Sequence, residues 1–232
     1  MDLRHNVNGT SVTPTRVVSS GIGSFWDFSN SASAFTFAGR STVSAQNITM
    51  ASIMTPTSTE GGGQYWLANS NTFDKGWAIG LSGSNVVQVL KAGVAGITSS
   101  ITLTNGNRYA VVVSIRPTAA CDFTVKDLAT GAISTGSASQ GSAPVAGDGV
   151  FVVGKGANGA CRVNVQMALI GLDTLWTFAQ QRDWVNAPYV CFRPIIRRRY
   201  FVPAAVAPGA PSSIFIQEHI GRGIGRGIFV GR

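Results

Sequence analysis

The sequence is poor in charged residues, which make up only 12% of the chain, whereas about a quarter is usual for a globular domain. Ser, Thr, Asn, Gly and Ala take the place of the missing charges. This polar but uncharged composition, with many Val, Ile and Thr runs, favours an all-β fold over a helical one. The length of 232 residues fits one domain with extensions.

Groups that serve as catalytic acid, base or nucleophile are few and scattered. The two histidines, His5 and His219, lie near the two ends of the chain, and we expect both at the surface. No two carboxylates are one residue apart on a strand, as a glycosidase pair on one face would be. The sequence therefore predicts a protein that is not an enzyme.

A calcium site would need several convergent oxygens. Two groups of side chains are candidates for such a site: Asp74 with Asn69 and Asn71, and Asp148 with Asn158. Asx residues of this kind are better explained as turn formers. We therefore expect no metal and no cofactor.

Signals for disulfides, export and membranes are also missing. Cys121, Cys161 and Cys191 are odd in number and form no CxxC pair, which predicts free, mostly buried thiols in a reducing compartment. Residues 1–5 contain no apolar segment like that of a signal peptide, and no run is long enough for a membrane span. We expect the protein to be made in a cytoplasm and to stay soluble there.

The chain does contain many short alternating or apolar runs separated by turn residues. The predicted strands are residues 25–28, 35–37, 47–54, 64–68, 76–81, 85–90, 101–103, 109–115, 121–125, 149–154 and 162–170. The run Tyr109–Ile115 predicts a central strand buried on both faces, whereas residues 133–146 predict a loop and residues 1–20 a loose arm or an edge strand. This spacing of strands and turns is typical of a two-sheet sandwich.

One segment has the character of a helix, and one pair of aromatic residues is a candidate sugar platform. Asp173 or Thr174 is expected to cap a helix that ends at Trp184. Tyr65 and Trp66 are neighbours on a predicted strand, so one of them is expected to point outward, where a sugar ring can stack on it.

The C-terminal segment differs from the rest of the chain. Residues 182–232 hold eight arginines and two acidic residues, a net charge of +6, whereas the preceding 181 residues carry +2. This segment is too small to bury a core, but its apolar runs require a partner. We predict an N-terminal arm at residues 1–20, a sandwich at 21–192 and a docking arm at 193–232. The expected assembly contacts are Arg193, Arg197, Arg198, Arg199, Tyr200, Phe201, Ile214, Phe215, Ile216, Arg222, Arg226, Ile228 and Phe229.

The basic arm leaves the class of partner open. Its arginines suit acidic neighbouring proteins, and its apolar runs are able to add strands to the edge of a neighbour's sheet. Tyr200 and Phe201, beside arginines, are stacking candidates for nucleic acid. The sequence contains no zinc-finger spacing, no RNA-binding aromatic signature and no basic helix, so nucleic acid is the less favoured partner.

The order of segments from residue 25 to residue 184 resembles the laminin-G/concanavalin-like jelly roll. Three pieces carry this resemblance: residues 76–81, 103–113 and 153–170. Residues 184–194 are similar to the motif that closes such domains in tailed-bacteriophage virion proteins, although Tyr189 stands where Trp is usual. In those proteins a basic aromatic segment and an Ala/Pro/Gly linker commonly follow, as they do here.

The resemblance implies a non-enzymatic structural protein of a tailed phage particle, made in the host cytoplasm and built into the virion. The main expectation is a capsid decoration, cement or head-fibre subunit anchored by its C-terminal arm. The alternative is a glycan-binding adhesin or tail-associated host-recognition module, and a nucleic-acid packaging accessory is third. The implied partners are the major capsid protein or tail components, further copies in a homo-oligomer, and in the alternative a host glycan.

Overall fold

The structure is a computed structural model that consists of two compact units, Met1–Val190 and Cys191–Arg232, which are described separately. It describes residues 10–12, 15–19, 23–28, 34–38, 47–58, 64–69, 75–91, 95–117, 120–139, 150–154, 161–172, 174–189, 214–220 and 224–230. Within these residues, no helix has the length and hydrophobicity that a membrane span requires.

The first sheet of the larger unit is built from seven antiparallel strands. These are β1 (Thr10–Val12), β4 (Ala34–Ala38), β6 (Gln64–Ala68), β7 (Trp77–Leu81), β8 (Val86–Lys91), β9 (Ala95–Thr102) and β13 (Val150–Val153). Their order across the sheet is β1-β4-β13-β6-β7-β8-β9. The short strand β1 forms one edge of this sheet and β9 forms the other.

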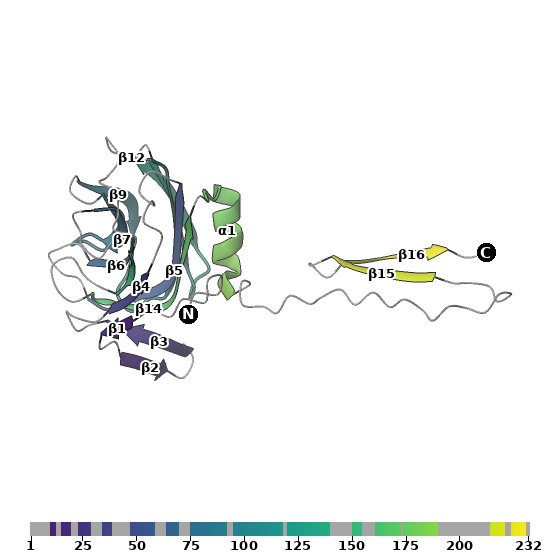
Figure 1. Ribbon diagram of the computed structural model, residues 1–232, viewed down its shortest axis with the longest axis horizontal. Coiled ribbons are helices and arrows are strands. Elements are labelled where there is room, and N and C mark those ends of the chain that lie inside the picture. The colour runs from purple at the N-terminus through teal and green to yellow at the C-terminus, as the bar shows by residue number, and fades with distance from the viewer. Residues whose placement is uncertain are drawn as a thin grey trace. The chain divides into compact units, whose positions relative to one another are not determined.

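The second sheet also has seven antiparallel strands. These are β2 (Thr15–Ser19), β3 (Gly23–Asp27), β5 (Ile48–Pro56), β10 (Tyr109–Ile115), β11 (Ala120–Asp127), β12 (Ile133–Ser139) and β14 (Val163–Leu172). They lie in the order β12-β11-β10-β5-β14-β3-β2. The two sheets pack face to face (Figure 1), which confirms the predicted all-β, two-sheet antiparallel sandwich.

The core lies between the sheets and follows from the alternation of side chains along each strand. Val111 and Val113 of β10 point into it, together with Trp66 and Trp77 from the first sheet. Ala110 and Val112 point to the opposite face of β10, where they are also fully buried. The prediction that Tyr109–Ile115 is buried on both faces is therefore confirmed.

A single helix in the described residues, α1 (Phe178–Asn186), covers that opposite face (Figure 1). Trp184 and Val185 pack there on Ala51, Ile53 and Ala110. The helix begins later than predicted, because Thr177 is the N-cap and Gln180 completes a capping box with it. The predicted cap at Thr174 is wrong, since residues 174–177 are not helical; Asp173 lies outside the described residues.

Two other expectations are resolved at the sheet edges. Residues 133–139 form the strand β12 and not a loop, because each of them pairs with a residue of β11. Their Gly, Ser and Ala residues give no strand pattern because every position of β12 is exposed or only half-buried. Residues 10–12 and 15–19, expected as a loose arm or an edge strand, form the edge strands β1 and β2.

The described part of the smaller unit is a two-stranded antiparallel sheet. Its strands are β15 (Ile214–Ile220) and β16 (Ile224–Val230), which pair over seven positions from Ile214 with Val230 to Ile220 with Ile224. The apolar runs expected to add to a neighbour's sheet are therefore paired with each other.

Candidate functional site

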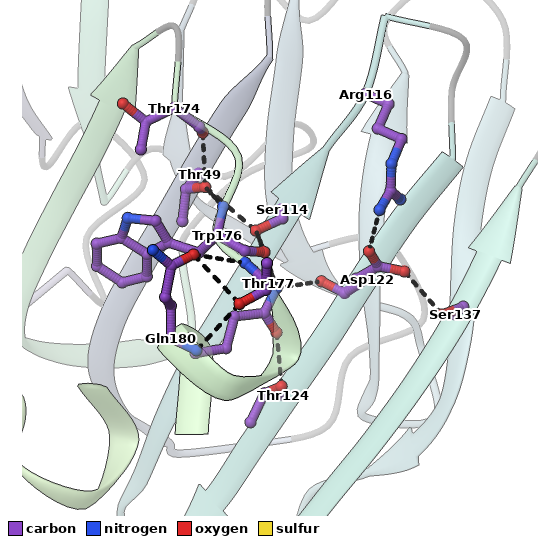
Figure 2. A network of polar contacts seen from close by, with 11 residues as sticks. Thr49, Ser114, Arg116, Asp122, Thr124, Ser137, Thr174, Trp176, Thr177 and Gln180 are labelled. Atoms are coloured by element: carbon purple, nitrogen blue, oxygen red, sulfur yellow. Dashed lines mark hydrogen bonds and ion pairs between the residues drawn. The ribbon is translucent and has the colours of Figure 1, made fainter. Parts of the chain in front are cut away.

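A buried chain of hydrogen bonds holds α1 and the segment before it against the second sheet (Figure 2). Thr49 of β5 and Ser114 of β10 share a hydrogen bond of 3.1 Å. The Thr49 hydroxyl accepts from the Trp176 backbone N–H at 3.1 Å, and the Ser114 hydroxyl donates to the Trp176 carbonyl at 2.9 Å. Trp176, which directly precedes the N-cap Thr177, is thus fixed through both of its backbone polar groups.

Gln181 connects the helix to this chain. Its side chain is fully buried, and its Nε2 donates to the Ser114 hydroxyl at 2.9 Å while its Oε1 accepts from the Thr124 hydroxyl at 2.5 Å. Nε2 also lies 3.4 Å from the Asp122 carbonyl oxygen. Because buried polar groups are costly unless paired, these contacts fix both the position and the rotation of α1.

The network reaches the surface at Asp122 on β11 (Figure 2). An Asp122 carboxylate oxygen lies 2.6 Å from Nη2 of Arg116, and the other accepts from the Ser137 hydroxyl at 2.7 Å. Register explains the cluster, since Asp122 lies opposite Ser114 on one side and Ser137 on the other, with Arg116 as a diagonal neighbour. The Asp122 side chain is 12% exposed and that of Arg116 is 37% exposed.

An exposed aromatic ring lies on α1. Phe178 is 37% exposed and lies three residues before Gln181, which makes the two side chains neighbours on α1. The second exposed ring in the described residues, Tyr189, follows the opposite end of the helix. We call the set Arg116, Asp122 and Ser137 the Arg116 surface.

The Arg116 surface has the chemistry of a recognition site. A guanidinium has five N–H donors in one plane, and within the described residues one of its nitrogens, Nη2, is engaged by Asp122. The carboxylate and hydroxyl beside it are acceptors. A planar donor group beside fixed acceptors suits a ligand that is rich in hydroxyl groups.

Nucleophiles and metal ligands do not gather in the described part of the chain. No group of three or more His, Cys, Asp and Glu residues there is able to hold a metal ion. Cys121 and Cys161 are buried thiols outside any disulfide, as predicted, and burial raises the pKa of both to about 12. Both are therefore protonated at neutral pH and unreactive. Cys191, His5 and the candidate calcium ligands apart from Asn69 lie outside the described residues.

The prediction that Tyr65 or Trp66 forms a sugar platform is wrong. Trp66 has no exposed surface, and its indole Nε1 donates to the Ser52 hydroxyl at 2.9 Å inside the sandwich. Tyr65 does face the other side of the sheet, but it is only 6% exposed and its hydroxyl accepts from Nε2 of Gln88 at 3.1 Å. Neither ring has a face on which a sugar is able to stack.

The residues expected to make assembly contacts fall into two groups. Six of them form part of the β15–β16 hairpin: Ile214, Phe215, Ile216, Arg226, Ile228 and Phe229. The other seven lie outside the described residues: Arg193, Arg197, Arg198, Arg199, Tyr200, Phe201 and Arg222. Their role in assembly stays a prediction.

Sequence reasoning did not find the Arg116 surface. Asp122 is one of the scattered carboxylates of the sequence, because Arg116 and Ser137 become its neighbours only when β10, β11 and β12 are paired in register. The available signal was a charged residue between two apolar residues, Cys121 and Phe123, near the start of a predicted strand. A charge in that position requires a partner on the adjacent strands.

The fold defines the chain as a β-sandwich protein, and comparison with known proteins places it among jelly-roll-like folds. No protein-family model and no curated protein matches the sequence. Among solved structures, tailspike protein 2 of an Escherichia coli O157:H7 bacteriophage has a TM-score of 0.55 and 17% identity, over 79% of this chain and 27% of that one. Two further similar structures come from other organisms.

Trypanosoma rangeli sialidase matches with a TM-score of 0.56 and 12% identity, over 79% of this chain and 30% of that chain. The binding domain of botulinum neurotoxin serotype G matches with a TM-score of 0.57 and 11% identity, over 81% of this chain and 48% of that chain. This chain thus spans between about a quarter and a half of each of these proteins. Identities this low show a shared fold alone.

Proposed function

We propose that the sandwich is a non-catalytic carbohydrate-recognition module of a tail-associated phage virion protein. The observation that carries this proposal is the Arg116 surface. There the Asp122 carboxylate forms an ion pair with the partly exposed guanidinium of Arg116 and accepts a hydrogen bond from the Ser137 hydroxyl. The fold similarity to a phage tailspike and to a toxin binding domain supports the same class of function. The capsid decoration, cement or head-fibre role expected from the sequence has no such support.

Carbohydrate is the ligand that best fits this chemistry. Neighbouring hydroxyls of a sugar ring accept from the planar N–H donors of Arg116 and donate to the Asp122 carboxylate. The apolar face of the sugar ring has a partner in the exposed ring of Phe178. The buried network below Asp122 keeps these groups in place before a ligand arrives, which lowers the entropic cost of binding.

Glycoside hydrolysis at the Arg116 surface would need a second carboxyl group within about 10 Å of Asp122. Asp122 and Asp127 stand near opposite ends of β11, roughly 16 Å apart at the rise of an extended strand. Asp183 is exposed on the side of α1 away from Gln181, and Asp27 is on β3, four strands across the sheet from β11. None of them forms a hydrolytic pair with Asp122.

Arg116→Ala is expected to weaken glycan binding about 10- to 100-fold, because charge-assisted hydrogen bonds contribute about 1.5–3 kcal/mol each. The probe is a panel of bacterial surface polysaccharides and the readout is titration calorimetry on the full chain. Arg182→Ala is the matched control, since it removes the same charge from the exposed face of α1. Phe178→Ala is compared in the same way with Tyr189→Ala, which removes the exposed ring beyond the other end of the helix.

The comparison of variants distinguishes the Arg116 surface from a general charge effect. Loss of binding in Arg116→Ala and Phe178→Ala, with wild-type affinity in both controls, supports the proposal. Equal losses in Arg116→Ala and Arg182→Ala would mean that only net charge matters. Wild-type affinity in all four variants would show that the ligand does not bind at this surface.

A further inference from the structure

The edge strand β12 carries a row of hydroxyl groups that α1 leaves uncovered. Side chains alternate between the two faces of the sheet, and Thr135, Ser137 and Ser139 share the face on which α1 lies. All three are exposed, because the helix packs over the neighbouring strands, where Gln181 binds the Thr124 hydroxyl of β11. We call Thr135, Ser137 and Ser139 the hydroxyl row.

The Arg116 surface, to which Ser137 belongs, lies toward one end of the hydroxyl row, and Lys126 lies beyond the other end. Ser137 is opposite Asp122, and Ile133 is opposite Lys126. Asp122 and Lys126 are four residues apart on β11, roughly 13 Å along an extended strand, which is longer than one sugar ring. A sugar chain that contacts the Arg116 surface is therefore able to reach Lys126 with a later unit.

The Lys126 ammonium is held in place without being neutralised. Its Nζ donates to Oδ1 of Asn186, in the last turn of α1, at 2.8 Å. An amide oxygen has no net charge and uses one of the three N–H donors of the ammonium. Asp127 points to the opposite face of β11 and accepts from the backbone N–H groups of its own turn. Within the part of the chain that the structure describes, Lys126 has no carboxylate partner.

The other charges on α1 and on this face of β10 to β12 cancel in pairs. The Arg116 surface contains an ion pair with no net charge. The two exposed charges of α1, Arg182 and Asp183, are opposite in sign. Arg108, which comes just before β10, is a further cation at the Lys126 end. This surface is therefore positive where Lys126 lies.

We propose that the ligand of this surface is an acidic polysaccharide and that Lys126 binds the carboxylate of one of its acidic sugar units. This inference rests on the proposed carbohydrate-recognition function and names the class of carbohydrate. The sugar chain lies along β12, with hydroxyls on the Arg116 surface and the hydroxyl row and a carboxylate on the ammonium. Asn186 is a positioning residue, because it orients the ammonium through its side-chain oxygen.

The test uses the full chain and pairs of polysaccharides that differ only in charge. Each bacterial capsular polysaccharide that contains uronic acid is titrated in its native form and after chemical reduction of its carboxyl groups to alcohols. The wild type is expected to bind the native form about 3- to 10-fold more tightly, because a partly exposed ion pair contributes modestly to affinity. This preference is expected to shrink as the salt concentration rises, since salt screens exposed charges.

Two kinds of variant separate the charge of Lys126 from its structural contact with the helix. Lys126→Met removes the charge and is expected to abolish the preference for the native form, whereas Lys126→Arg is expected to keep it. Asn186→Asp leaves Lys126 in place and pairs it with a carboxylate. It is therefore expected to abolish the preference as well, with an unfolding midpoint close to that of the wild type. Lys75→Met, which removes an exposed charge just before β7 of the other sheet, is the matched control and is expected to change neither.

The outcomes distinguish this inference from the carbohydrate proposal itself. Equal affinity of the wild type for the two forms would overturn the inference, and so would an unchanged preference in Lys126→Met. In both cases, weaker binding of the two forms by Arg116→Ala would still support carbohydrate recognition at the Arg116 surface. A wild-type chain that binds neither form of any polysaccharide would contradict both proposals.

Discussion

Trp66→Ala is expected to destabilise the sandwich by about 3–5 kcal/mol, the usual cost of emptying a large aromatic site in a core. Trp66 has no exposed surface, so the deletion creates a cavity between the sheets. It also leaves the Ser52 hydroxyl, which accepts from the indole N–H at 2.9 Å, without that partner. Against a total stability of about 5–15 kcal/mol, this loss is large.

Chemical denaturation followed by far-ultraviolet circular dichroism measures this effect without relying on the deleted fluorophore. Val18→Ala, at a residue that is 72% exposed on β2, is the control and is expected to change stability by no more than about 0.5 kcal/mol. A Trp66→Ala variant with wild-type stability and impaired glycan binding would contradict the structure and restore Trp66 as a sugar-stacking residue.

Gln181→Leu is expected to destabilise the protein by about 2–4 kcal/mol, because it leaves the buried hydroxyls of Thr124 and Ser114 without a partner on α1. Leucine has a similar volume, so the loss reports hydrogen bonding more than packing. The effect on Arg116 should follow, since Gln181 also contacts the backbone of Asp122. Arg182→Leu, next along the helix and exposed, is expected to be close to neutral.

A double-mutant cycle with Thr124→Val isolates the pair. Valine removes the hydroxyl that Gln181 binds, so the double variant should be less destabilised than the sum of the single variants, by about 0.5–3 kcal/mol. Strict additivity would show that Thr124 and Gln181 do not interact, and that α1 is held by its apolar contacts alone.

The sequence predicted those strands best whose burial is uniform along their length. Tyr109–Ile115 is apolar throughout because both of its faces are covered, one by the opposite sheet and the other by α1. The strand Ile133–Ser139 was missed for the opposite reason, since it lies at an edge where small polar residues suffice. The local composition of a strand depends on its environment, so an exposed edge strand has a composition like that of a loop.

The prediction of a sugar platform was wrong for a different physical reason. Alternation correctly placed Tyr65 and Trp66 on opposite faces of the sheet, but β6 is buried on both faces. Tyr65 lies over Gly80 of the neighbouring strand, where a Cβ atom would come within 2.3 Å of the tyrosine ring. Period-two patterning assigns a side chain to a face, but whether that face is covered depends on the rest of the fold.

The Arg116 surface could not be predicted because its members are brought together by register between strands. Ser137 is fifteen residues from Asp122 in sequence and becomes its neighbour only through the pairing of β11 with β12. The apolar runs of residues 214–216 and 228–230 were expected to add strands to a neighbour's sheet, whereas they belong to two strands that pair with each other.

The most direct test of the central claim is to incubate the full wild-type chain with purified bacterial surface polysaccharides and to follow both binding and polysaccharide length. The expected result is saturable binding to at least one polysaccharide, competed by its oligosaccharides, with no change in the length distribution after prolonged incubation. Depolymerisation of a bound polysaccharide would contradict the non-catalytic assignment. Absence of binding across host and non-host polysaccharides would contradict carbohydrate recognition itself.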